Sequence, residues 1–109
     1  MSGQYARLMD MRGLTASLTQ PREQVLDLGA FRILVLDPRI ITLGAGGNII
    51  VETASVNEEG AFRTIATIPL NAVSAMIEVT TFLRFVRWRT DALVAGNPVA
   101  LIDVMAKDG

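Results

Sequence analysis

The 109-residue sequence contains no cysteine and no histidine. Without cysteine the chain forms neither a disulfide nor a thiolate zinc site. Without histidine it lacks the side chain that acid–base chemistry near neutral pH most often uses, and it has no Ser–His or Cys–His pair. We therefore expect a non-catalytic protein rather than an enzyme, with no catalytic, cofactor-binding or metal-binding residues.

Charge is also scarce. Charged residues make up 19% of the chain, and ten Lys or Arg against eleven Asp or Glu give a net charge of −1. This balance provides no general attraction to nucleic acid or to an anionic membrane, so neither is an expected partner. No apolar run approaches the ~20 residues that span a bilayer. The first residues lack the apolar stretch of a secretory signal, so we expect synthesis in the cytoplasm.

Apolar residues, in contrast, make up 50% of the chain. One domain of this length buries many of them, and a surplus left on the surface is typical of a contact between subunits. We therefore expect a closed homo-oligomer, with a trimer as the working expectation.

From residue 25 onward the sequence predicts short strands separated by turns. The predicted strands are 25–28, 31–36, 40–43, 48–55, 62–70, 76–79, 82–90 and 99–107. Pro38 predicts a bulge or an edge position. The glycines of 44–47 predict one hairpin turn, and the polar residues 57–60 predict a second. Short strands with this spacing favour an all-β antiparallel β-sandwich of jelly-roll or discoidin-like type over residues 25–109.

Residues 1–24 differ from the rest and are predicted to be an extended or partly helical N-terminal arm. Tyr5, Leu8, Met9 and Arg12 have helical spacing before Gly13, and residues 14–24 suit an extended segment. Terminal arms stay loose unless they dock on something. The alternatives are a floppy tail and an arm that lies on a neighbouring subunit through Tyr5, Leu8, Met9, Arg12, Leu14 and Leu18.

The few sites where chemistry is conceivable have simpler explanations. The carboxylates that could act as a catalytic pair are scattered over different strands and turns: Asp27, Asp37, Glu52, Glu78, Asp91 and Asp103. Residues 57–59 offer too few oxygen ligands for calcium. The glycines of 44–47 precede no Gly-Lys-Ser/Thr, so they form a turn and not a phosphate loop.

The segment 82–90, Phe-Leu-Arg-Phe-Val-Arg-Trp-Arg-Thr, is the most distinctive. With a period of two, Val86 and Trp88 point into the core, and Phe85, Arg87 and Arg89 share the outer face. Three roles are open for these arginines: protein contact or an internal salt bridge, a solvated face, and binding of nucleic acid or sugar.

The order of segments from residue 25 resembles the compact discoidin-like, or galactose-binding-like, β-sandwich of minor structural proteins in tailed phages and gene-transfer-agent particles. Thr53, Ser55, Gly60 and Phe62 match its Thr-x-Ser strand, turn and aromatic residue. A later strand is matched by the run Phe85, Val86, Arg87 and Trp88. The resemblance covers about 80 residues. It implies a decoration or connector role on a virion surface, often as a symmetric oligomer.

Together these features predict a non-catalytic virion structural protein, a capsid decoration or stabilising subunit. Its partners would be the major capsid protein or another virion protein, and copies of itself. The predicted interface residues are Tyr5, Leu8, Met9, Arg12, Leu14, Leu18, Phe85, Arg87 and Arg89. The alternatives are a carbohydrate-binding module of a fibre or an enzyme, and, third, a single-strand nucleic-acid binder.

Overall fold

The computed structural model describes residues 3–29 and 31–108, which form eight strands and one short 3₁₀ turn. In chain order these are β1 (Gly3–Gly13), the 3₁₀ turn Arg22–Gln24, β2 (Leu26–Asp27), β3 (Ile33–Thr42), β4 (Asn48–Ala54), β5 (Arg63–Pro69), β6 (Ile77–Val79), β7 (Phe85–Thr90) and β8 (Val99–Lys107). No helix within the described ranges is long and apolar enough to cross a membrane.

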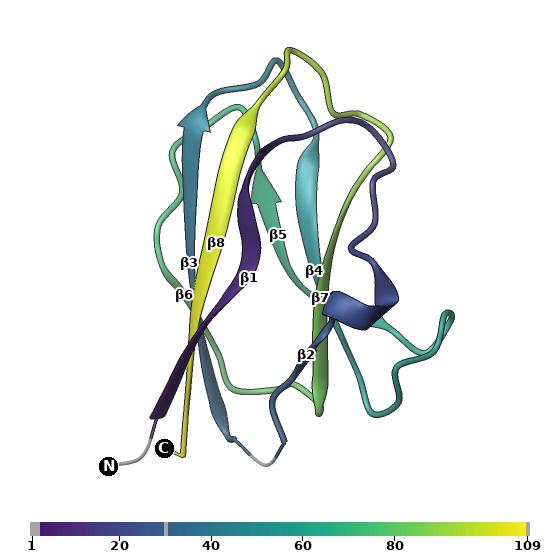
Figure 1. The fold of residues 1–109 in the computed structure, drawn as a ribbon. Helices are drawn as coiled ribbons and strands as arrows, with labels where there is room; N and C mark the ends of the chain where they lie inside the picture. The colour runs from purple at the N-terminus through teal and green to yellow at the C-terminus, as the bar shows by residue number, and fades with distance from the viewer. Residues whose placement is uncertain (1–2, 30, 109) are drawn as a thin grey trace.

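The strands form two four-stranded antiparallel sheets that pack face to face as two layers (Figure 1). Sheet A has the order β1-β8-β3-β6, and sheet B has the order β2-β7-β4-β5. The predicted all-β antiparallel fold is therefore confirmed as a sandwich of two packed sheets.

The strand pairs are nested about the turn between β4 and β5. Strand β1 pairs with β8, β2 with β7, β3 with β6, and β4 with β5. The pairs β3–β8 and β4–β7 join these ribbons into the two sheets. Because of this nesting, the start of β1 and the end of β8 lie side by side, with Gly3 opposite Lys107 (Figure 1).

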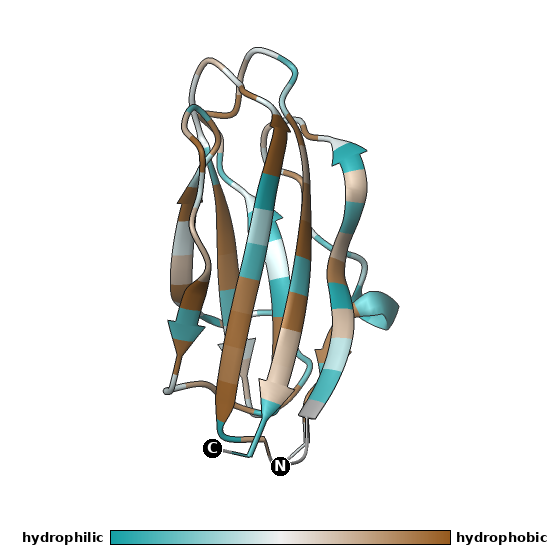
Figure 2. Cartoon of the chain, turned by 90° about the vertical axis from the view of Figure 1, so that its left-hand side faces the viewer, coloured by the Kyte–Doolittle hydropathy of each residue, from teal (hydrophilic) through white to brown (hydrophobic). Residues whose placement is uncertain are grey.

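The core lies between the sheets and is almost entirely aliphatic around one tryptophan. Trp88 and Val86 of β7 are at most 1% exposed, which confirms their predicted inward direction. Figure 2 shows by hydropathy that the strands of sheet A carry many apolar residues. Burial nevertheless alternates along them, as in the second half of β8, where Val104 and Ala106 are buried and Asp103, Met105 and Lys107 are partly exposed. This alternation is what a sheet with one buried and one open face requires.

Pro38 lies within β3, opposite Ile102 of β8. The Arg32 N–H donates to the Lys107 carbonyl at 3.0 Å, so odd-numbered residues of β8 direct their backbone groups toward β3. Pro38 and Ile102 therefore form a pair whose backbone groups point away from each other. Strand β6 pairs only as far as Leu36, so Pro38 occupies the predicted edge position and leaves no ladder bond unmade.

The predicted N-terminal helix is wrong for the described residues, because residues 3–13 form the edge strand β1, paired with β8. The register of this pair shifts between Arg7 and Met9 and again between Met9 and Arg12. These irregularities place Leu8 and Met9, which are adjacent in sequence, both in the core, at 2% and 1% exposed. The loose arm is not confirmed.

Residues 14–20, predicted as an arm for a neighbouring subunit, lie instead along β7 of the same chain. Backbone hydrogen bonds run from Gln20 to Trp88 at 3.1 Å and from Thr90 to Leu18 at 2.7 Å. This segment and β2 together cover the free edge of β7 in sheet B.

Three smaller predictions also need correction. Residues 44–47 connect sheet A to sheet B and do not form a hairpin, since β3 and β4 belong to different sheets. The two predicted strands on either side of Pro38 are one strand, β3. Strand β7 begins at Phe85 and not at Phe82. The second predicted hairpin is confirmed by the β4–β5 pair.

Candidate interaction surface

The outer face of sheet A carries a row of apolar side chains across three strands. Tyr5 of β1, Met105 of β8 and Val35 of β3 are register partners, so their side chains share this face. Met76, 69% exposed, lies just before β6 and completes the row. Tyr5 is 81% exposed. We call the surface formed by Tyr5, Val35, Met76 and Met105 the apolar row.

A shallow depression of about 200 Å³ lies between these side chains, with Asp37 and Asp103 at its border. A depression lined by an aromatic ring, two thioethers and an aliphatic side chain suits apolar contact. The depression is therefore a feature of the folded subunit itself.

Charged residues border the apolar row. Asp103 and Asp37 are direct cross-strand partners, and each is balanced by an arginine. Arg7 contacts both oxygens of Asp103 at 2.8 and 3.4 Å, and Arg39 contacts Asp37 at 3.2 Å. The hydrogen bond from Arg7 lowers the pKa of Asp103 and raises that of Arg7. The border is polar but has no net charge.

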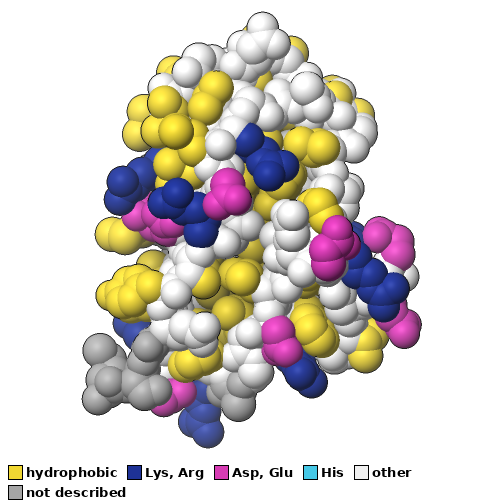
Figure 3. All heavy atoms as spheres, in the orientation of Figure 1, with side chains coloured by type: hydrophobic (Ala, Val, Ile, Leu, Met, Phe, Trp, Pro, Cys, Tyr) yellow, Lys and Arg dark blue, Asp and Glu magenta, His cyan; other side chains and the backbone are white. Residues whose placement is uncertain are grey.

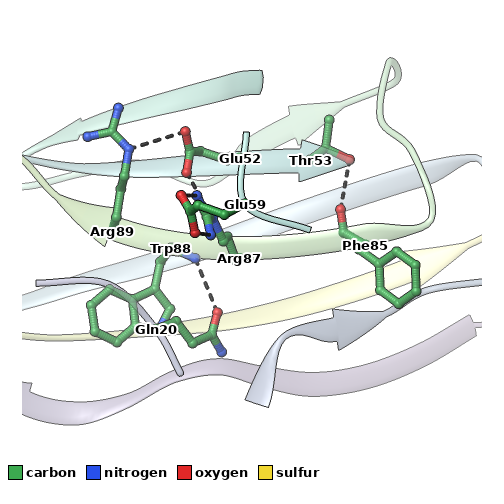
Figure 4. A network of polar contacts seen from close by, with 8 residues as sticks. All are labelled: Gln20, Glu52, Thr53, Glu59, Phe85, Arg87, Trp88 and Arg89. Carbon is green, nitrogen blue, oxygen red and sulfur yellow. Dashed lines mark hydrogen bonds and ion pairs between the residues drawn. The ribbon is translucent and has the colours of Figure 1, made fainter. Parts of the chain in front are cut away.

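A second cluster lies on the outer face of sheet B, around Arg87 (Figure 4). Its Nε lies 3.0 Å from Glu52 Oε1, and its two terminal nitrogens contact both oxygens of Glu59 at 2.9 and 3.0 Å. The ring of Phe62 stacks on the guanidinium at 4.0 Å. Glu59 and Phe62 come from the β4–β5 loop, so this loop folds back over β7.

These contacts hold the β4–β5 loop against β7. The side chain of Arg87 is only 9% exposed and that of Glu52 only 8%. The hydrogen bond from Arg87 lowers the pKa of Glu59, and the same bond raises the pKa of Arg87. Arg89 also pairs with Glu52, at 3.2 Å. Of the three roles left open for these arginines, the internal salt bridge is the one observed.

The predicted interface residues therefore separate into three groups. Tyr5 lies on the open face, as an interface residue should. The structure corrects the placement of the buried residues on an exposed interface, since Leu8, Met9 and Leu14 lie in the core and Arg87 lies in the salt-bridge cluster. The remaining four are partly exposed, and their interface role stays a prediction: Arg12, which lies over the Trp88 ring at 5.2 Å, Leu18, Phe85 and Arg89. Sequence reasoning missed Met76 and Met105, although Met105 alternates with core residues in β8.

The upper end of the molecule in Figure 1 is a set of tightly packed loops, 43–47, 70–76 and 91–98, which we call the loop end. Hydrogen bonds tie these loops together, from Gly44 N–H to Leu70 at 2.7 Å and from Ala45 N–H to Ala95 at 2.8 Å. Its large exposed side chains are apolar, with Val73 87% and Leu93 72% exposed, and the amides of Asn71 and Asn97 are exposed beside them. Asp91 is the one charged residue in these three loops, and the tip of the molecule in the view of Figure 3 shows hydrophobic and uncharged groups.

Among the candidate carboxylates, Asp37 and Asp103 lie opposite each other across β3 and β8, and each is paired with an arginine, while the others are on separate strands and loops of the described residues. Most have a basic or amide partner: Asp27 binds Arg84, Asp37 binds Arg39, Glu52 binds Arg87, Asp91 binds Asn48, and Asp103 binds Arg7. In residues 3–29 and 31–108 no three acidic side chains come together as a metal site.

Comparisons with known proteins returned nothing. No protein-family model matches the chain, and neither the curated proteins nor the solved structures include a match.

Proposed function

We propose that the protein is a non-catalytic structural subunit of a tailed-phage-like virion, which decorates or stabilises the capsid. Its partners are the major capsid protein or another virion protein, and neighbouring copies of the same subunit. The observation that carries this proposal is the apolar row on sheet A, because an exposed apolar surface with a balanced polar border suits protein–protein contact.

The strand order supports a jelly roll as the finer description of the fold. An eight-stranded jelly roll is a double sheet built from two Greek keys, a form used in viral capsid and lectin domains. The nested pairs β1–β8, β2–β7, β3–β6 and β4–β5 are those of one long ribbon folded over into two sheets. Fold alone does not assign function, so the proposal depends on the apolar row.

The test is fractionation of particles from cells that carry the gene. Density-gradient fractions are analysed by mass spectrometry for this chain relative to the major capsid protein. We expect a constant ratio across the particle peak, and a Tyr5→Glu/Met76→Glu variant should be lost from it. A chain that stays in the soluble fractions would refute the virion role.

The second candidate is a carbohydrate-binding module, since lectins share the jelly-roll form. One feature favours it: Tyr5 is an exposed ring beside two carboxylates, Asp37 and Asp103, which can accept hydrogen bonds from sugar hydroxyls. The loops 44–47 and 91–97 contain no aromatic residue, and Phe62 stacks on Arg87. A glycan array on which Tyr5→Ala abolishes a signal would favour this candidate over the first.

A further inference from the structure

The β1 edge of sheet A supports a further inference. Each sheet has two outer strands, and three of these four edges are short, interrupted or blocked. Strand β6 has three residues, and the β2 side contains a 3₁₀ turn. Strand β5 has a register irregularity and ends in Pro69. Long unprotected edges are templates for pairing with another chain.

Strand β1 is different in its first half. Residues 3–7 pair with β8 in unbroken register, and the irregularities begin only after Arg7. Gln20 Nε2 donates to the Leu8 carbonyl at 3.1 Å, which blocks the edge from that point on. No described residue hydrogen-bonds to the backbone on the outer side of residues 3–7. Five residues of regular edge are therefore open.

The direction of the backbone groups on this edge follows from the ladder. The Leu14 N–H donates to the Pro98 carbonyl, so the even-numbered residues of β8 direct their backbone N–H and C=O groups toward β1. Tyr5 pairs with Met105, an odd-numbered residue that faces β3. Tyr5, and with it Gly3 and Arg7, therefore directs its N–H and C=O away from β8 and out of the sheet.

These three residues are self-complementary about a two-fold axis. In an antiparallel pair of two β1 strands centred on Tyr5, each Tyr5 is opposite the other Tyr5, and each Gly3 is opposite Arg7 of the other copy. All outward N–H and C=O groups of the three residues then find partners. The Arg7 side chains stand at opposite ends, so no like charges face each other, whereas a register centred on Arg7 would place the two arginines opposite one another.

We infer that two copies of this chain pair through residues 3–7 of β1, which joins their A sheets into one eight-stranded sheet. The two Tyr5 side chains then lie next to each other on the outer face, and the two apolar rows become continuous across the axis. Because a two-fold contact is closed, the β1 edges of both copies are paired in the dimer and neither can bind a third copy. The inference deepens the proposed function, whose contact with neighbouring copies it specifies, and it replaces the expected trimer.

The first experiment is light scattering on the full chain and two proline variants. Tyr5→Pro removes an outward N–H that the subunit itself does not use, so the fold is retained and pairing is lost. Thr67→Pro is the matched control. The Leu70 N–H donates to the Gly47 carbonyl, and counting back along β5 makes the N–H of Thr67 point outward on the other sheet.

The expected mass is that of two 11.8 kDa subunits for the full chain and for Thr67→Pro, and of one subunit for Tyr5→Pro. Circular dichroism should show the same β-sheet content in all three. At about 100 μM an interface with a 1 μM Kd is saturated, so a full chain that is still monomeric at that concentration overturns the inference. A dimer that survives Tyr5→Pro overturns it as well, and so does a trimer.

A cross-link gives an independent test that does not depend on proline. The chain has no cysteine, so Tyr5→Cys introduces a single thiol. Directly opposite residues in a hydrogen-bonded pair have Cα atoms about 5.5 Å apart, which is within the range of a disulfide. Mild oxidation should give a covalent dimer for Tyr5→Cys and none for Val73→Cys, which is equally exposed at the loop end. Equal cross-linking of both variants overturns the inference.

The two proposals fail separately. A dimer that does not co-purify with particles removes the virion role and leaves the edge pairing. A monomer that co-purifies with particles at a constant ratio removes the edge pairing and leaves the virion role.

Discussion

Gln20 and Trp88 are joined by two hydrogen bonds, one through the backbone and one through a side chain. The Gln20 N–H donates to the Trp88 carbonyl at 3.1 Å, and the Trp88 N–H donates to Gln20 Oε1 at 3.2 Å. The amide nitrogen of the same side chain donates to Leu8 of β1. A single buried amide thus links the edge of sheet A to β7 of sheet B.

Gln20→Ala should therefore destabilise the fold strongly. The substitution leaves the Trp88 N–H and the Leu8 carbonyl without these partners in a site where Gln20 is 5% exposed. We expect a loss of about 2–4 kcal/mol in the free energy of unfolding, measured by urea denaturation. Gln24→Ala, at an exposed side chain, should stay within about 0.5 kcal/mol. Equal effects of the two substitutions would contradict this role.

Arg87→Met should destabilise more than Arg39→Met. Arg87 is 9% exposed and binds two glutamates, whereas Arg39 is 62% exposed and binds one aspartate. Losing the buried contacts of Arg87 should lower the free energy of unfolding by about 2–4 kcal/mol. Losing the exposed pair should cost less than about 1 kcal/mol. Proteolysis should also cut the β4–β5 loop faster in Arg87→Met, because Glu59 and Phe62 lose their anchor; unchanged cleavage would argue against the anchoring role.

The free energy of unfolding should not change with pH near neutrality and should decrease in acid. The hydrogen bond from Asn48 lowers the pKa of Asp91, and that from Arg7 lowers the pKa of Asp103. A carboxyl group whose pKa is lower in the folded state stabilises the fold above its unfolded pKa of about 3.9, and this contribution is lost as the pH falls through the folded pKa.

Because the chain has no histidine, no side chain with an ordinary pKa titrates between about pH 5.5 and 8. The urea midpoint should therefore be constant over that range and drop below about pH 4. Asp91→Asn should flatten the acid part of the profile, and a midpoint that changes between pH 6 and 8 would contradict the expectation.

Gly47→Ala should lower the melting temperature more than Gly60→Ala. Both glycines have positive φ, +88° and +89°, so alanine is strained at each by about 1–2 kcal/mol. At Gly47 the new Cβ would also lie 2.4 Å from backbone atoms of Val94, while at Gly60 nothing lies within 4 Å. The difference in melting temperature between the two variants isolates the packing of the loop end. Equal melting temperatures would mean that these loops are not tightly packed.

The central strands could be predicted from the sequence because their signals are local. β-Branched residues flank the polar turn 57–60, and this pattern predicted β4, β5 and their pairing. The period-two alternation around Val86 and Trp88 predicted the inward face of β7 in the same way.

Strand β1 could not be predicted because its irregular register imitates a helix. Tyr5, Leu8, Met9 and Arg12 have the spacing of one helical face, yet Tyr5 lies on the open face of the sheet. The burial of both Leu8 and Met9 arises from the register shifts of an edge strand. The burial of Arg87 was also hidden, since Glu59 is 28 residues away and meets it only when the loop folds back. Of the candidate surface, the sequence identified Tyr5 but not the strands that would lie beside it.

The nesting of the strand pairs has a consequence for how the chain reaches its native state. Residues of β1 are synthesised before their partners in β8, which lie about a hundred positions later, with Gly3 opposite Lys107. The innermost hairpin, β4–β5, needs only a short loop closure and can form early, while the outermost ribbon closes last. On the ribosome, β1 therefore waits unpaired with both edges open until β8 emerges, and chaperone binding or premature pairing between nascent chains would act during this interval.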